Sequence, residues 1–142
     1  MSENVSVPGE TSPDWSLLFS DSIEIAAAQN AWRIVTIEQR ERDLLTDTNR
    51  QLILRLVCSY VLYERELRHV AEQGAVIQPK RGSKKAIARV NPHFTTMSKL
   101  SIEASTLEGL LGISPRSRGK VTRADRKAGR ALAADKYLKL VK

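Results

Sequence analysis

The sequence predicts a mainly helical protein, with an antiparallel helical hairpin as its core and a small β-hairpin between two of its helices. Three observations predict this fold class. Apolar residues recur at helical spacing in three separate stretches of the 142-residue chain. Residues that favour helix starts, namely Asp, Thr and Asn-Pro, precede those stretches. A segment with turn residues and β-compatible residues separates the second stretch from the third.

The N-terminal part of the chain predicts a flexible tail, a short anchor and a first helix. Residues 1–14 are polar and contain two prolines and a glycine, so we expect them to be loosely ordered. The apolar cluster at 15–19 should dock on the body of the protein. Asp21 is expected to cap a helix that ends near Arg42, with Glu24 as the reciprocal member of a capping box. The apolar positions expected on the core face of this helix are Ile23, Ala27, Ala31 and Ile34, with Trp32 and Val35 alongside.

A second helix is predicted from Asp47 to Gln73, with Thr46 as its cap. Ten of the twelve residues at 52–63 are apolar, so this part of the helix needs cover on nearly all sides. The run is too short for a membrane span, which takes about 20 residues, and Arg55 interrupts it. We expect neighbouring subunits to supply part of the cover. The alternative is a monomeric helical bundle with this helix at its centre.

Residues 75–90 predict a β-hairpin after the second helix. Gly74 ends that helix, Pro79 and Gly82 favour a turn, and Ile87 and Val90 are β-compatible. Cations occupy the expected tip of the hairpin. They would either contact phosphates or protect the exposed edge of the sheet, and the sequence leaves both interpretations open. These four cations are Lys80, Arg81, Lys84 and Lys85.

A third helix is predicted over residues 91–111. Asn91-Pro92 is a strong start signal, and Gly112 offers the left-handed conformation of a helix cap. Ser114-Pro115 then signals another helix start. We expect the second and third helices to form the antiparallel core and the oligomer interface. The predicted interface residues are Leu52, Leu56, Tyr60, Tyr63, Met97, Leu100, Leu107 and Leu111.

The net charge of +7 is unevenly distributed along the chain. Residues 1–73 carry 7 Lys and Arg against 12 Asp and Glu, whereas residues 74–142 carry 16 against 4. Such polarity predicts an acidic body with a basic part that contacts a polyanion such as nucleic acid. The alternative is that the cations only keep a tail soluble.

The predicted DNA contacts lie mainly beyond the third helix. Residues 122–142 predict a basic C-terminal helix capped by Thr122, with a frayed soluble tail as the alternative. The hairpin-tip cations are secondary candidates. The primary candidates are Arg116, Arg118, Lys120, Arg123, Arg126, Lys127 and Arg130.

The sequence shows no catalytic constellation. It lacks the His-Glu-x-x-His, paired-cysteine and Gly-x-Ser-x-Gly motifs. The stretch from Gly112 to Lys120 is not a phosphate-binding loop, because six residues rather than four separate its glycines. His69 is interpreted as a solvated helix residue, and neither it nor His93 shows an evident partner. The chain is therefore predicted to be no enzyme and to use no cofactor or metal.

The order of these elements resembles one branch of the small subunits of tailed-bacteriophage terminases. The matching residues are Asn91-Pro92, Leu100, Leu107 and Leu110, then Gly112-Ile113-Ser114-Pro115 and Arg118. The entry to the second helix, Leu44-Leu45-Thr46-x-x-Asn49, is also similar. The resemblance covers roughly residues 15–121, which we take as a core and oligomerisation domain.

This resemblance implies a non-catalytic DNA-packaging factor in the cytoplasm of the infected bacterial host. Small terminase subunits form rings of roughly eight to twelve copies, bind double-stranded viral DNA near the packaging initiation site, and recruit the large subunit, which holds the ATPase and the nuclease. We expect the large subunit to dock around residues 137–141. Arg118 matches the family motif. It would either contact DNA or join the turn after the third helix to the same turn of a neighbouring subunit. A stand-alone DNA- or RNA-binding regulator and a structural phage protein are the alternatives.

Overall fold

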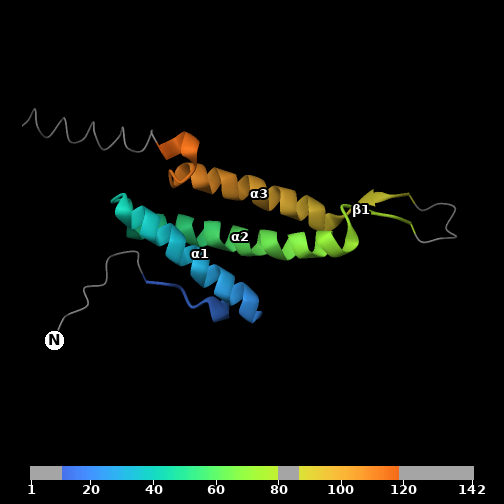
Figure 1. Ribbon diagram of the computed structural model, residues 1–142, viewed down its shortest axis with the longest axis horizontal. Coiled ribbons are helices and arrows are strands. Elements are labelled where there is room, and N and C mark those ends of the chain that lie inside the picture. Colours follow the sequence, from blue (N-terminus) through green and yellow to red (C-terminus); the bar gives the residue numbers. More distant parts are fainter. Residues whose placement is uncertain (1–10, 80–86, 119–142) are drawn as a thin grey trace, which may run out of the picture. The chain divides into compact units, whose positions relative to one another are not determined.

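The computed structural model describes residues 11–79 and 87–118. It is mainly helical, with three helices and a two-stranded antiparallel hairpin, as the sequence predicts (Figure 1). Most of the predicted tail at 1–14, the hairpin tip and the C-terminal helix at 122–142 lie outside the described residues. The chain divides into two compact units, Met1–Leu107 and Glu108–Lys142, which we describe separately. The elements are η1 (Trp15–Leu17), α1 (Ser22–Glu41), α2 (Asp47–Gln73), β1 (Val76–Ile77), β2 (Arg89–Val90) and α3 (Pro92–Leu110).

The main core of the first unit lies between α1, α2 and the N-terminal anchor. Trp15 and Phe19 are buried, which confirms half of the predicted anchor, whereas Leu17 and Leu18 are exposed. The Trp15 ring meets the edge of Trp32 from α1 at 5.8 Å between centroids. The buried apolar residues of the two helices are Ala28, Trp32 and Val35 from α1, and Ile53, Leu56, Val57 and Val61 from α2.

The expected core face of α1 was correct for Trp32 and Val35, which are buried, but wrong for Ile23 and Ile34. Ile23 and Ile34 are 65% and 52% exposed, so the buried face is rotated from the predicted one. Glu24 and Gln39 lie on the buried face, and their polarity hides its periodicity in the sequence. A buried Glu or Gln needs hydrogen-bond partners, which no sequence pattern of this helix reveals.

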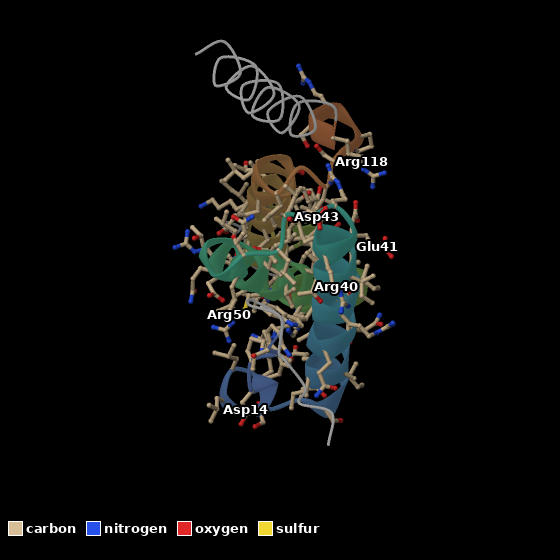
Figure 2. The ribbon with its side chains drawn as sticks, turned by 90° about the vertical axis from the view of Figure 1, so that its left-hand side faces the viewer. Asp14, Arg40, Glu41, Asp43, Arg50 and Arg118 are labelled. Carbon is tan, nitrogen blue, oxygen red and sulfur yellow. The ribbon has the colours of Figure 1, made fainter. Side chains whose placement is uncertain are left out.

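The antiparallel helical hairpin consists of α1 and α2 rather than of α2 and α3. The closest helix packing is between α1 and α2 (Figure 1). A short loop that contains Asp43 joins them (Figure 2). Asp43 adopts a positive φ of 54°. The side chain of Asn49 closes this loop by donating to the carbonyl of Leu44 at 2.8 Å. The short loop keeps α1 next to α2, and both helices contribute buried apolar residues to the core.

The predicted helix ends are confirmed. Asp21 accepts from the Ile23 amide and Thr46 from the Asn49 amide, each as the cap of its helix. Gly74 ends α2 with a φ of 83°. The predicted hairpin is also confirmed, because β1 pairs antiparallel with β2, with Val76 opposite Val90.

Candidate nucleic-acid interface

The structure describes two of the predicted DNA contacts, Arg116 and Arg118, both of which are exposed. They follow a corner in the second unit, where Gly112 takes a φ of 67° and the Ile113 amide donates to the carbonyl of Glu108. The remaining predicted contacts lie outside the described residues. These are Lys80, Arg81, Lys84, Lys85, Lys120, Arg123, Arg126, Lys127 and Arg130.

Arg118 helps to build the corner that carries it. Its Nε donates to the carbonyl of Ile113 at 3.1 Å. A helical turn starts at Pro115, as the Ser-Pro signal predicts, and the Ser114 carbonyl accepts from the amides of Ser117 and Arg118. Part of the Arg118 guanidinium therefore has a structural role within its own corner. Arg116 lies on the exposed side of this turn.

Asn91 fixes the base of the hairpin that carries the secondary cations. It is fully buried, and its Oδ1 accepts from the His93 amide at 3.0 Å, which confirms the predicted cap of α3. Its Nδ2 donates to the carbonyl of Gly74 at 2.8 Å, and its backbone amide donates to the carbonyl of Ala75. Asn91 thus joins the end of α2, the hairpin and the start of α3.

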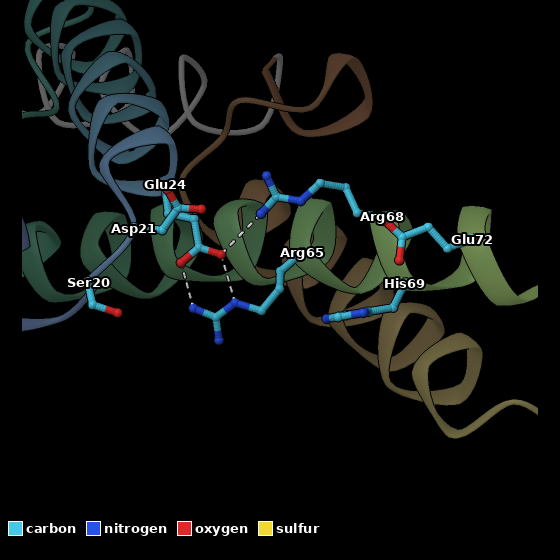
Figure 3. Close-up of a pocket in the computed structure, with 7 residues that line it drawn as sticks. All are labelled: Ser20, Asp21, Glu24, Arg65, Arg68, His69 and Glu72. Atoms are coloured by element: carbon cyan, nitrogen blue, oxygen red, sulfur yellow. Dashed lines mark hydrogen bonds and ion pairs between the residues drawn. The ribbon is translucent and has the colours of Figure 1, made fainter.

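A charged cleft between α1 and α2 was not predicted from the sequence (Figure 3). The Glu24 carboxylate accepts from Arg65 Nε at 2.8 Å, from Arg65 Nη2 at 2.6 Å and from Arg68 Nη2 at 3.1 Å. The hydrogen bonds from Arg65 hold the pKa of Glu24 below its ordinary value, and the same contact raises the pKa of Arg65. Glu24 is therefore an ion-pair residue rather than the capping-box residue that we expected.

The two histidines also lie in contact, so the expectation that they have no partner was wrong. The rings of His69 and His93 stack with centroids 4.4 Å apart. The Nδ1 of His93 lies 2.6 Å from Oε2 of Glu66. These contacts join the first turn of α3 to α2. Their sequence separation of 24 to 27 residues explains why spacing along one helix did not reveal them.

The cleft is poorly suited to a polyanion. Its volume is about 550 Å³, and its lining contains more carboxylates than guanidinium groups. Within the described residues, no group of three or more His, Cys, Asp or Glu side chains could hold a metal ion. The contacts of Glu24 instead hold α1 against α2. The lining residues are Ser20, Asp21, Glu24, Arg65, Arg68, His69 and Glu72.

Three of the predicted interface residues are buried in the chain itself: Leu56, Leu107 and Leu111. The others, Leu52, Tyr60, Tyr63, Met97 and Leu100, are half-buried. A side chain that is buried within its own chain cannot contact another subunit directly, and it affects an interface only by packing against residues that do. The interface assignment stays a prediction.

Comparison with known families decides the class of protein. The family model described as phage terminase, small subunit, matches residues 28–128. The chain belongs to this family. The resemblance to this family inferred from the sequence is thereby confirmed. The match covers the larger part of α1 and all of α2, the hairpin, α3 and the Gly112 corner. No curated protein and no solved structure matches the chain.

Membership of the terminase small-subunit family implies a role in phage DNA packaging. The family is non-catalytic, which confirms that the chain is not an enzyme. It also implies DNA and the large terminase subunit as partners. Among the described residues, no helix is long and apolar enough to cross a membrane.

Proposed function

We propose that this small subunit binds double-stranded viral DNA at the packaging initiation site and there recruits and regulates the large terminase subunit. It would act as a ring of roughly eight to twelve copies in the cytoplasm of the infected bacterial host. The family match over residues 28–128 carries this proposal. The concentration of positive charge in residues 74–142 supports the DNA contact.

A ring would convert weak contacts into tight binding. Each copy supplies a few cations, and their repetition around a ring multiplies the effective affinity for one duplex. Exposed apolar side chains on α1 and α3, such as Ile34 and Ile102, support self-association.

DNA binding tests the cationic contacts. We expect the affinity for duplex DNA to fall linearly on a log–log plot against salt, with a slope of about −0.9 for each neutralised phosphate. Reversing Arg123, Arg126 and Arg130 to Glu should reduce that slope by about 2.7 and lower the affinity at least ~10-fold at low salt. Fluorescence anisotropy with a labelled duplex gives both quantities.

The matched control reverses three exposed cations outside the predicted contacts, Arg33, Arg55 and Lys99, to Glu. It changes the net charge equally, so a comparable loss in both variants would mean that binding depends only on total charge. Salt-independent binding would contradict the proposed phosphate contacts. If the reversal of Arg123, Arg126 and Arg130 dissociates the oligomer instead, these three arginines belong to the subunit interface.

Docking of the large subunit at residues 137–141 rests on the sequence alone, because these residues lie outside the described part of the chain. Replacing Tyr137 and Leu138 by Ser should weaken capture of the large subunit in a pull-down. It should leave DNA binding intact, since no cation is removed.

A further inference from the structure

Polar side chains attach the first turn of α3 to the later turns of α2. The Nδ1 of His93 lies 2.6 Å from Oε2 of Glu66. The His93 ring also stacks on the ring of His69, with centroids 4.4 Å apart and planes 25° apart. We define the α2–α3 latch as Glu66, His69 and His93. Because the latch is made of ionisable groups, its strength depends on their protonation.

The hydrogen bond between His93 and Glu66 can become an ion pair without breaking. An ionised carboxylate only accepts hydrogen bonds, so Nδ1 of His93 is the donor. A second proton on Nε2 of His93 makes the ring a cation and leaves the Nδ1 bond in place. Charge-assisted hydrogen bonds are stronger than neutral ones. The two side chains are 37% and 16% exposed, so water screens the pair only in part.

The stack limits the latch to one added proton. Two charged rings with centroids 4.4 Å apart repel each other, whereas a charged ring beside a neutral one does not. Glu66 lies at hydrogen-bonding distance from His93 and stabilises the charge there. We therefore expect His93 to take the proton and His69 to stay neutral beside it.

The other charged groups around the latch are of both signs. In the cleft between α1 and α2, the carboxylate of Glu24 is already bound by two arginines (Figure 3). The first turn of α3 contains no acidic residue, and Arg89 of the neighbouring strand β2 is exposed. The charged residues that line the cleft together with His69 are Asp21, Glu24 and Glu72, against Arg65 and Arg68.

We propose that the latch is a pH-responsive device, in which His93 takes up one proton and thereby tightens the attachment of α3 to α2. Histidine ordinarily changes its charge between pH 5 and 8, where carboxylates remain ionised. The folded chain offers this proton an ion pair that the unfolded chain lacks. The latch is therefore strongest toward pH 6 and weakens as the pH rises toward 8. It lies within a single chain and needs neither the ring nor DNA.

The base of the hairpin would respond together with the latch. Asn91 immediately precedes α3, and its Nδ2 donates to the carbonyl of Gly74 at 2.8 Å. Its backbone amide donates to the carbonyl of Ala75, next to β1. Tightening the first turn of α3 therefore also steadies the point at which the hairpin is attached.

Hydrogen exchange of the full-length wild-type chain at pH 6 and pH 8 tests the device. The Thr95 amide donates to the carbonyl of Asn91 in the first turn of α3, so its exchange reports opening of the latch. After correction for intrinsic exchange rates, we expect residues 91–97 to be about 2- to 5-fold more protected at pH 6, as a partly exposed ion pair allows. The internal control is the first turn of α2, where the Arg50 amide donates to the carbonyl of Thr46. Its protection should not change.

Three variants assign the proton within the latch. Glu66→Gln keeps an acceptor for Nδ1 of His93 but removes the charge, and should abolish the pH effect. His69→Phe keeps a stacked ring and should preserve the effect. The matched control Glu64→Gln removes an exposed carboxylate from the same helix and should also preserve it. Unchanged protection of residues 46–52 shows that each variant is folded.

The opposite results overturn the proposal. Equal protection of residues 91–97 at both pH values would mean that the latch does not respond, and lower protection at pH 6 would mean that repulsion between two charged rings prevails. A pH effect that survives Glu66→Gln would remove Glu66 as the partner. Loss of the effect in His69→Phe would place the proton on His69. A similar change in residues 46–52, or loss of the effect in Glu64→Gln, would show a general response to pH rather than one of the latch.

Discussion

At the residue scale, the Glu24 carboxylate is the polar group that joins the start of α1 to the later turns of α2. It is 5% exposed and accepts three hydrogen bonds from two arginines. The arginine side chains are themselves 39% and 47% exposed, so water screens the pair from one side. The pair should therefore contribute less than a fully buried one.

Replacing Glu24 by Gln should lower the free energy of unfolding at pH 7 by about 1–3 kcal/mol, after allowance for the screened arginines. The pKa of Glu24 is below its ordinary value of 4.5. The stabilisation is therefore complete above that value and is lost as the pH falls through the folded-state pKa. The gap between wild type and variant should narrow below pH 4.5. Urea unfolding at several pH values measures it.

Glu64→Gln is the matched control, since Glu64 is an exposed carboxylate on α2. It should change the free energy of unfolding by less than about 0.5 kcal/mol. A gap between wild type and Glu24→Gln that stays constant with pH would contradict the charge-based role of Glu24.

Contacts between side chains that are far apart in the sequence could not be predicted. Glu24 follows Asp21 at the spacing of a capping box, and the sequence therefore favoured a local role. Its partners Arg65 and Arg68 lie more than 40 residues away, in another helix. The contact of His93 with His69 and Glu66 was missed for the same reason.

At the element scale, Asn91 determines how α3 starts and where the hairpin is attached. Its side chain accepts from the His93 amide and donates to the carbonyl of Gly74, so it caps one helix and binds the end of another. The cap could be predicted because Asn-Pro is a local signal. The hydrogen bond from Asn91 to Gly74 could not be predicted, because it forms only when the hairpin brings the end of α2 close to the start of α3.

Two substitutions separate these roles of Asn91. Asn91→Ser keeps a capping oxygen but loses the bond to Gly74, and should cost about 1–2 kcal/mol of the free energy of unfolding. Asn91→Ala loses both and should cost about 2–4 kcal/mol. Chemical denaturation measures both, with the exposed Asn30→Ala as the control. Equal costs for Ser and Ala would contradict the capping role.

The ends of the helices could be predicted more reliably than their buried faces. Thr46, Gly74 and Gly112 act locally, through a cap or a positive φ, and the structure bears them out. The face of α1 depends on what α2 and the Trp15 anchor bring to it. In the apolar stripe with the clearest periodicity, Ile23 and Ile34 are exposed, and the alanines between them are half-buried.

At the scale of the whole molecule, membership of the terminase small-subunit family offers a reason for two features that a single isolated chain leaves unexplained. The two halves of the sequence differ in charge, and α1 and α3 both present uncovered apolar residues. A ring of copies would cover the apolar surfaces and would gather the cations around one DNA duplex. The charge asymmetry and the family could be recognised from the sequence.

The most direct test of the central claim is the ATPase rate of the large terminase subunit from the same phage, measured with and without this chain. In the presence of viral DNA that contains the packaging initiation site, we expect the wild-type chain to change the rate at least ~2-fold, because it would place the large subunit on DNA. The Arg123, Arg126 and Arg130 reversal should remove most of this effect, and the Arg33, Arg55 and Lys99 reversal should preserve it. An ATPase rate that is unchanged by a folded wild-type chain, with or without DNA, would contradict the account.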